Sequence, residues 1–265
     1  MTEERNGRES EKALDVPVHA DEELQDLLHG ELVILQKKDG YHFSVDPLLL
    51  TSFIELKNGD KVIDLGTGSG VMPLVLANRL RALDTAFVGL ELQENIADMA
   101  ERSVAANRMK DKIAILRGDI RKIGEEFAAD SFDIVISNPP YLPVGKGTVN
   151  PNDAKALARH EVLVTLADVV RAARYLLKSH GRAYFIYPTY RLIDLICQCR
   201  EHKLEPRRLR FIHANAAGGS KLAMLEAIRD AGVELKVVRP LHVYNMEGFY
   251  SEEVAEILNE HDLVK

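Results

Sequence analysis

Residues 61–70 read KVIDLGTGSG, a short apolar run that passes directly into glycines at alternate positions. An apolar run of this length bounded by glycine is typical of a buried strand. The glycines let the backbone turn sharply and approach a ligand without a Cβ clash. A helix is expected over residues 71–81, and its amino end would present free N–H groups to the turn. The stretch therefore predicts a ligand-binding turn between a strand and a helix.

The spacing of the glycines limits which ligand the turn can hold. Gly66, Gly68 and Gly70 give GxGxG, whereas the dinucleotide fingerprint is GxGxxG. No Gly-Lys-Ser or Gly-Lys-Thr follows, so the turn is not a phosphate loop of the Walker type. A glycine-rich turn that binds no ligand is the alternative interpretation.

Apolar strands and amphipathic helices alternate through the middle of the chain. The expected strands are 61–66, 86–91, 113–116, 132–136 and 182–186, and the expected helices are 71–81, 96–107, about 161–178 and 192–200. Such alternation predicts an α/β fold with a doubly wound, mostly parallel sheet. Residues 208–213 and 221–226 leave no room for a helix between them, which predicts a terminal antiparallel β-hairpin. The second of these segments could also form a short helix.

Composition excludes several classes of protein. The 265 residues are 46% hydrophobic and include only two cysteines, which excludes a disulfide scaffold and a paired-cysteine zinc ribbon. The net charge of −7 disfavours a protein that coats long stretches of nucleic acid but leaves room for a local basic surface. The sequence shows no secretory signal and no apolar run long enough to span a bilayer. We therefore expect a cytoplasmic protein, and a monomer is favoured.

The chain is predicted to form one domain after a tail. Residues 1–20 are polar and charged and are predicted to be disordered. Residues 21–265 are expected to form a single domain, with an N-terminal segment at 21–57, a core at 58–230 and a C-terminal extension at 231–265. The extension ends in an acidic stretch, 246–260, which is predicted to form a turn and a surface helix.

Two acidic residues follow the second and third expected strands. Glu91 ends the second strand, where its carboxylate could accept both hydroxyls of a ribose lying across the crevice of an open α/β sheet. The alternative is an acid that only contacts solvent. Asp119 closes the third strand and is suited to an adenine amino group, or else to capping a short helix around residues 120–127.

The fourth expected strand ends in Asn138-Pro139-Pro140-Tyr141. The prolines restrict the backbone and hold Asn138 on a rigid corner. A planar amino group is a poor nucleophile because its lone pair is delocalised into the ring. The Asn138 side-chain oxygen and the Pro139 carbonyl could accept both of its N–H groups and turn that lone pair out of the ring plane. The ring of Tyr141 could stack on such a substrate, with its face rather than its hydroxyl making the contact.

Together these residues resemble the class I S-adenosylmethionine-dependent methyltransferases that carry an NPPY motif, over about residues 41–230. The resemblance implies a seven-stranded, Rossmann-like methyltransferase sheet and S-adenosyl-L-methionine as cofactor. It implies that residues 64–70 bind the methionine part, Glu91 the ribose and Asp119 the adenine, while Asn138, Pro139, Pro140 and Tyr141 are catalytic. The candidate cofactor contacts are Phe43, Asp46, Asp64, Gly66, Thr67, Gly68, Gly70, Glu91, Leu92, Asp119, Ile120 and Asn138.

Flanking segments narrow the resemblance. Residues 40–50, GYHFSVDPLLL, are similar to the GxxFxxDxxLL segment of the bacterial tRNA1(Val) adenine-37 N6-methyltransferase family, in which the segment covers the cofactor. Residues 159–161 (RHE) and 221–226 (KLAMLE) resemble that family as well. The resemblance implies methylation of adenine N6 in tRNA near the anticodon. A protein glutamine N5-methyltransferase, a small-molecule amine methyltransferase and a catalytically silent cofactor- or RNA-binding module are the alternatives.

A tRNA partner requires local positive charge. The candidate phosphate contacts are Lys37, Lys38, Lys146 and Arg207. No metal is expected, since Cys197 and Cys199 on one helix would direct their sulfur atoms apart and no histidine spacing is typical of a metal site. A membrane partner is not expected either.

Overall fold

The computed structural model describes residues 16–39, 44–141 and 164–259. The strands of its central sheet are β3 (Lys61–Leu65), β4 (Ala86–Glu91), β5 (Ile113–Arg117), β6 (Phe132–Ser137), β7 (Leu177–Pro188), β8 (Leu204–His213), β9 (Ser220–Arg229), β10 (Lys236–Val237) and β11 (Leu241–His242). The helices are α1 (Asp46–Thr51), α2 (Val71–Arg79), α3 (Glu94–Ala106), α4 (Ile123–Glu126), α6 (Leu166–Leu176), α7 (Leu192–Glu201) and α8 (Glu252–Leu258), with short 3₁₀ turns η1 (Ile120–Lys122) and η2 (Thr189–Arg191). A separate hairpin consists of β1 (Glu22–Leu27) and β2 (Leu32–Lys37).

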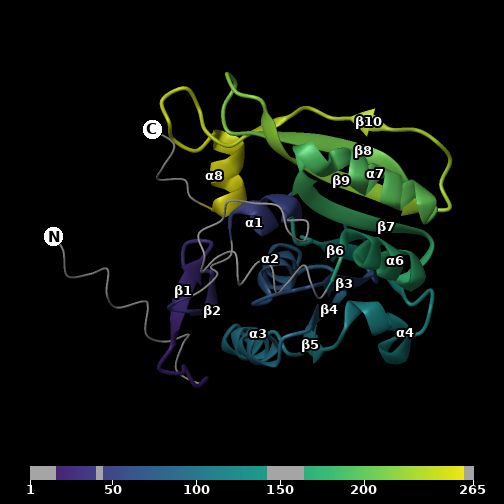
Figure 1. Ribbon diagram of the computed structural model, residues 1–265. Coiled ribbons are helices and arrows are strands. Elements are labelled where there is room, and N and C mark those ends of the chain that lie inside the picture. The colour runs from purple at the N-terminus through teal and green to yellow at the C-terminus, as the bar shows by residue number, and fades with distance from the viewer. Residues whose placement is uncertain (1–15, 40–43, 142–163, 260–265) are drawn as a thin grey trace.

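The central sheet has the strand order β10-β8-β9-β7-β6-β3-β4-β5, with β11 also pairing with β8 (Figure 1). The strands β5, β4, β3, β6 and β7 are parallel to one another, and β9 runs antiparallel between β7 and β8. The expected α/β class, the parallel strands and the terminal antiparallel hairpin are therefore confirmed. The sheet has nine strands rather than the expected seven, because the two-residue strands β10 and β11 add to the outer edge of β8. Strands of two residues are too short to leave a hydrophobic period in the sequence.

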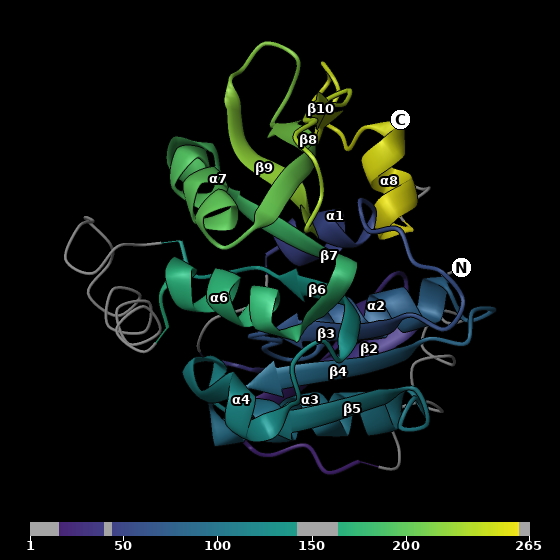
Figure 2. The same cartoon turned by 90° about the vertical axis from the view of Figure 1, so that its right-hand side faces the viewer.

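Helices cover both faces of the sheet. In Figure 1, α1, α2 and α3 lie on one side of the sheet, and Figure 2 looks onto the other side, which α4, α6 and α7 cover. Alternate residues of each strand serve the two faces, as the pleat requires. Val62 packs into the cluster on the α1–α2 side, whereas Ile63 packs into the cluster on the α6–α7 side. Burial on both faces explains why the strands read as nearly continuous apolar runs.

The helix predicted over 161–178 has different ends in the structure. Residues 161–163 are outside the described ranges, and α6 begins at Leu166, because Thr165 and Asp168 form a capping box in which each side chain accepts the other's backbone N–H. The helix ends at Leu176, and β7 starts at once with Leu177 paired to Phe132. Residues 177–178, expected at the end of the helix, therefore lie within β7.

The N-terminal segment forms a hairpin that the sequence analysis did not identify. The N–H groups of Val33 and Leu35 in β2 donate to the Asn107 Oδ1 and Ser103 Oγ atoms of α3, at 3.0 Å each. These side chains satisfy backbone donors that an edge strand would otherwise leave unpaired. This part of the segment expected over the cofactor therefore packs against α3.

The predicted tail, 1–20, falls mostly outside the described residues. Its last part makes contacts with the domain. Arg102 of α3, which is 9% exposed, donates to the carbonyl of Pro17 at 2.7 Å and forms two hydrogen bonds with the buried carboxylate of Glu22. The pKa of Glu22 is lowered to about 2 by the hydrogen bonds from Arg102. The folded chain thus begins no later than Pro17.

The C-terminal extension forms the expected helix, α8, which exposes Glu252 and Glu256 and buries its apolar face in the core. Val254, Ile257 and Leu258 of α8 are buried in the cluster that also contains α1 and α2. Figure 1 shows α8 beside α1. The Arg79 guanidinium of α2 donates to the Ile257 carbonyl, and the Ser251 hydroxyl accepts from the Val254 N–H at the amino end of the helix. No helix in the described ranges is long and apolar enough to cross a bilayer.

A buried ion pair connects the terminal hairpin to α1. The Glu226 carboxylate of β9, 5% exposed, pairs with Arg208 Nε of β8 at 3.0 Å and accepts from the Tyr184 hydroxyl of β7 at 3.1 Å. The Arg208 guanidinium lies over the ring of Phe53 at 4.3 Å and donates to the Phe53 carbonyl at 2.6 Å. The segment after α1 is therefore fixed by a residue 155 positions away along the chain, roughly the length of a domain.

Replacing Arg208 with Met should lower the free energy of unfolding by about 3 kcal/mol, because Glu226 would remain charged, buried and without its cation. Equilibrium unfolding in urea measures this loss. Arg117→Met is the matched control, since Arg117 pairs with Glu94 but both side chains are more than half exposed, and such pairs contribute little. Equal stability of the Arg208 variant and the wild type would contradict a structural role for the pair.

Candidate functional site

The candidate site lies where three parallel strands end at one edge of the sheet. In the register, Asp64 of β3 pairs with Gly89 of β4 and with Ile136 of β6. Two residues further along each strand, the chain reaches Gly66, Glu91 and Asn138. The structure thus brings the glycine turn, the acid after β4 and the proline corner to the same edge, which is where open α/β sheets bind ligands.

The glycine turn has open space at Gly66 and Gly68. Gly66, Gly68 and Gly70 have φ values of 78°, 56° and 85°, a region that favours glycine. A Cβ built on Gly66 or Gly68 would meet no described atom within 4 Å, whereas one on Gly70 would contact Ala100 of α3 at 3.5 Å. The first two glycines therefore leave space for a ligand, and the third serves helix packing.

Gly89 supports this turn and was not singled out from the sequence. A Cβ at Gly89 would lie 2.8 Å from Ile115 Cδ1 and 2.9 Å from the side chain of Thr67. The N–H groups of Gly66 and Thr67 donate to the Leu90 carbonyl at 2.9 and 3.0 Å. Thus β4 contacts the turn closely and fixes it by hydrogen bonds. In the sequence, the sign of this close approach is a glycine inside an otherwise apolar strand.

Asp64 is fully buried at the start of the turn. Its Oδ2 atom accepts from the Thr67 hydroxyl at 2.8 Å, and its Oδ1 atom has no hydrogen-bond partner among the described residues. Burial raises the pKa of Asp64 to about 7, and the nearby Glu91 adds to the rise. A buried carboxyl oxygen of this kind calls for a donor, which a bound ligand or water could supply.

Glu91 joins the two loops of the site. It is 8% exposed, and its Oε2 atom accepts from the Gly68 N–H at 3.1 Å while Oε1 accepts from the Gln93 N–H at 2.9 Å. Each carboxylate oxygen can accept a further hydrogen bond. The alternative of an acid that only contacts solvent is therefore wrong. Leu92, the next predicted contact, is half-buried.

The carboxylate of Asp119 is engaged by Arg121, two residues further along the same turn. Its Oδ1 atom accepts from the Arg121 N–H at 2.9 Å and caps η1, and its Oδ2 atom pairs with the Arg121 guanidinium at 2.6 Å. These hydrogen bonds hold the pKa of Asp119 below its usual value. The capping interpretation is confirmed. Ile120, predicted to touch the cofactor, is 8% exposed and packs in the core on the α6 side.

The proline corner is held by side chains from distant segments. The Tyr141 hydroxyl lies 2.5 Å from Asn138 Oδ1 and 3.3 Å from Asp46 Oδ2. Its ring packs edge-on against Tyr187 at 5.8 Å, and its carbonyl accepts from Arg191 at 2.9 Å. Desolvation raises the pKa of Asp46. The hydroxyl of Tyr141, which was not expected to contact the substrate, therefore orients the Asn138 oxygen.

The candidate phosphate contacts that the structure describes, Lys37, Lys38 and Arg207, are engaged with other groups of the protein. Lys37 pairs with Asp21 at 2.7 Å and with Glu22, and Lys38 donates to the Ala20 carbonyl at 3.1 Å. Lys146, like Phe43 of the cofactor set, lies outside the described residues.

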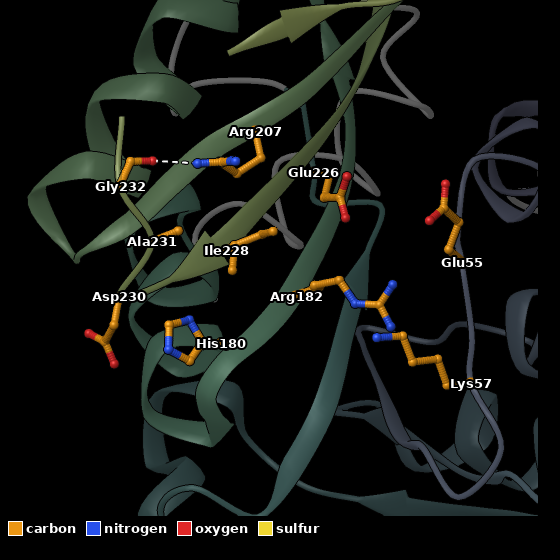
Figure 3. A pocket seen from close by; sticks show the side chains of 10 residues that line it. All are labelled: Glu55, Lys57, His180, Arg182, Arg207, Glu226, Ile228, Asp230, Ala231 and Gly232. Atoms are coloured by element: carbon orange, nitrogen blue, oxygen red, sulfur yellow. Dashed lines mark hydrogen bonds between the residues drawn. The ribbon is translucent and has the colours of Figure 1, made fainter. Parts of the chain in front are cut away.

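Arg207 lies away from the strand ends that carry Asn138. It donates to the Gly232 carbonyl at 2.7 Å (Figure 3). It also pairs with Glu234. The pocket beside it is lined by residues such as His180 near the start of β7 and Lys57 just before β3. This is the edge of the sheet where the parallel strands begin. Arg207, one of the candidate phosphate contacts, therefore lies at the opposite edge of the sheet from Asn138, because the start of β8 lies on the same edge as the start of β7.

A sequence profile described as a methyltransferase domain matches residues 56–229. The chain belongs to this family. The match covers the sheet from β3 to the end of β9 and includes every strand end of the candidate site. Within the described residues, no group of three or more His, Cys, Asp or Glu side chains is placed to hold a metal ion.

Relatives named tRNA1(Val) (adenine(37)-N6)-methyltransferase resemble this methyltransferase-domain chain. The one from Aeromonas salmonicida is 32% identical over 159 residues, and the one from Bacteroides thetaiotaomicron is 28% identical over 159 residues. Each alignment covers 60% of this chain, and the chain spans 64% and 65% of the two relatives. The resemblance to that family drawn from the sequence is confirmed.

Solved structures agree on the fold. A predicted O-methyltransferase from Agrobacterium tumefaciens superposes with a TM-score of 0.66 at 20% identity, covering 81% of this chain and 96% of that chain. An S-adenosylmethionine-dependent methyltransferase from Aquifex aeolicus gives 0.51 at 14% identity, covering 69% and 89%. At these identities the likeness shows the methyltransferase fold, and the sheet order described above is its framework.

Proposed function

We propose that this protein transfers a methyl group from S-adenosyl-L-methionine to the exocyclic N6 amino group of an adenine in tRNA near the anticodon. The observation that carries the proposal is the Asn138–Tyr141 corner at the end of β6, directly beside the glycine turn that ends β3. A protein that only bound a cofactor or RNA would have no use for an acceptor held on a rigid corner at that place.

The residues at the ends of β3 and β4 fit this cofactor. Gly66 and Gly68 leave open space where a side chain would stand, and Glu91 retains acceptor capacity for ribose hydroxyls. The unpartnered Oδ1 of Asp64 suits an ammonium donor, which the methionine part contains. When bound, the cofactor supplies an electrophilic methyl group on a sulfonium. Asp119 fits the adenine less directly, because Arg121 already pairs with its carboxylate.

Asn138 acts on the substrate amine through its side-chain oxygen. That oxygen has two lone pairs, and the Tyr141 hydroxyl occupies one of them. The second can accept one amino N–H while the Pro139 carbonyl accepts the other. These contacts turn the nitrogen lone pair out of the ring plane, and the amine loses its proton to water after transfer. Catalysis is then mainly positioning of the substrate, which can lower the activation barrier by about 7 kcal/mol in favourable cases.

The substrate assignment is supported by the names of the relatives, which act on adenine in tRNA1(Val) according to those names. The alignments cover 60% of this chain. The corner itself would also accept a glutamine side-chain amide, which shares the planar amino group. Identifying the methylated product therefore decides between an RNA base and a protein amide.

Gly66→Ala should abolish S-adenosylmethionine binding, because a Cβ would enter the space left for the ligand and the residue would be strained at φ 78°. Gly59→Ala is the matched control: Gly59 also has a positive φ, 85°, and open surroundings, but it precedes β3 at the other edge of the sheet. Calorimetry should show wild-type affinity for the control. Equal affinity of both variants would contradict the assignment of the turn.

Asn138→Ala should lower methyl transfer by about 2–4 kcal/mol of transition-state stabilisation while cofactor affinity hardly changes, since one preorganised acceptor is lost. The assay incubates wild type and variant with radiolabelled cofactor and total bacterial tRNA, then digests the RNA and identifies the labelled nucleoside. We expect N6-methyladenosine from the wild type.

Three results would contradict the proposal in different ways. Near-full activity of Asn138→Ala would show that the corner is only a turn. Label in a glutamine of added protein, with tRNA unlabelled, would favour the protein amide. Tight cofactor binding without any labelled product would favour a silent binding module.

A further inference from the structure

The residues that follow β7 expose apolar surface beside the proline corner. Tyr190 is 71% exposed and Ile193 is 70% exposed, although both are large hydrophobic side chains. They are three positions apart across η2 and the first turn of α7, a spacing that places side chains on the same side of a helical turn. We refer to these two side chains as the Tyr190–Ile193 surface.

This surface is fixed to the corner by hydrogen bonds. The Arg191 guanidinium donates to the Tyr141 carbonyl at 2.9 Å, and the Tyr190 hydroxyl lies 3.5 Å from the same carbonyl. Arg191 also lies over the ring of Tyr187 at 5.5 Å and pairs with Asp194 at 3.1 Å. Because Arg191 is anchored on both sides, the Tyr190–Ile193 surface and the corner keep a fixed relative position.

We infer that Tyr190 stacks on a nucleotide adjacent to the target adenine in the RNA, with Ile193 as the apolar floor of that contact. The inference rests on the proposed function. An adenine whose amino group reaches Asn138 must leave its stack, so its neighbours lose a stacking partner. An exposed aromatic ring beside the corner replaces that partner, as in other single-stranded RNA contacts.

The charge distribution favours stacking over phosphate contacts at this place. The protein has a net charge of −7, and the candidate cations Lys37 and Arg207 are paired with acids. Arg191 is likewise engaged with Asp194 and the Tyr141 carbonyl. Stacking on an aromatic ring needs no net positive charge, since every base presents a π-face.

The test compares Tyr190→Ala and Tyr190→Phe on two substrates: an anticodon stem-loop RNA that contains the target adenine, and free adenosine, which has no flanking nucleotide. We expect Tyr190→Ala to raise KM for the stem-loop by about tenfold or more, with kcat nearly unchanged. Tyr190→Phe should behave like the wild type. Activity on adenosine should be the same for all three proteins. Phe249→Ala, a partly exposed aromatic (44%) on the C-terminal extension, is the matched control and should leave KM unchanged.

A second measurement reports the contact itself. A stem-loop with 2-aminopurine next to the target should lose fluorescence on binding to the wild type, because stacking quenches this base, and should lose little on binding to Tyr190→Ala. An unchanged KM and equal quenching would overturn the inference while leaving the proposed function intact. An equal loss of activity on adenosine would also overturn it, since Tyr190 would then act through Tyr141. Label on protein glutamine only would instead overturn the proposed function, and the inference with it.

Discussion

The whole site depends on the parallel register of β3 with β4 and β6. Asp64 pairs with both Gly89 and Ile136, so the chain leaves all three strands at one edge, and the segments after them must share that space. The buried carboxylate of Glu91 then joins two of these segments by accepting from the N–H groups of Gly68 and Gln93. A shift of one residue in either pairing would turn the side chains of that strand to the other face. Register in the sheet is therefore the constraint from which the proposed cofactor and substrate positions follow.

The corner after β6 depends on more distant parts of the chain. Asp46 at the start of α1 and Arg191 after β7 both contact Tyr141, one at its hydroxyl and one at its carbonyl. The segment after α1 is in turn fixed by Arg208, which donates to the Phe53 carbonyl and pairs with the buried Glu226. The terminal hairpin thus supports the corner through α1. Residues 221–226 therefore support the site although they do not line it.

The features predicted correctly from the sequence are those that depend on residues close together in the chain. The five parallel strands, the glycine turn and the acid after β4 were all identified, because apolar runs, glycine and strand-end acids leave direct signals. Features that depend on contacts between distant parts of the chain were not predicted. The β1–β2 hairpin depends on Asn107 and Ser103 side chains that accept from β2, and burial of α8 depends on its docking beside α1. The place of Arg207 could not be predicted, because residue types carry no signal for the pairing of the antiparallel hairpin that positions it. The start of α6 was missed although Thr165 and Asp168 have the spacing of a capping box.

The central claim is that the ends of β3 and β4 hold S-adenosylmethionine with its ribose on Glu91. A crystal structure of the protein with S-adenosylhomocysteine, the demethylated product, tests it most directly. We expect both ribose hydroxyls to lie within about 2.6–3.2 Å of the Glu91 carboxylate oxygens. We expect the amino-acid part of the ligand to lie against Gly66 and Gly68. A ligand bound elsewhere, with Glu91 still contacting only the N–H groups of Gly68 and Gln93, would contradict it.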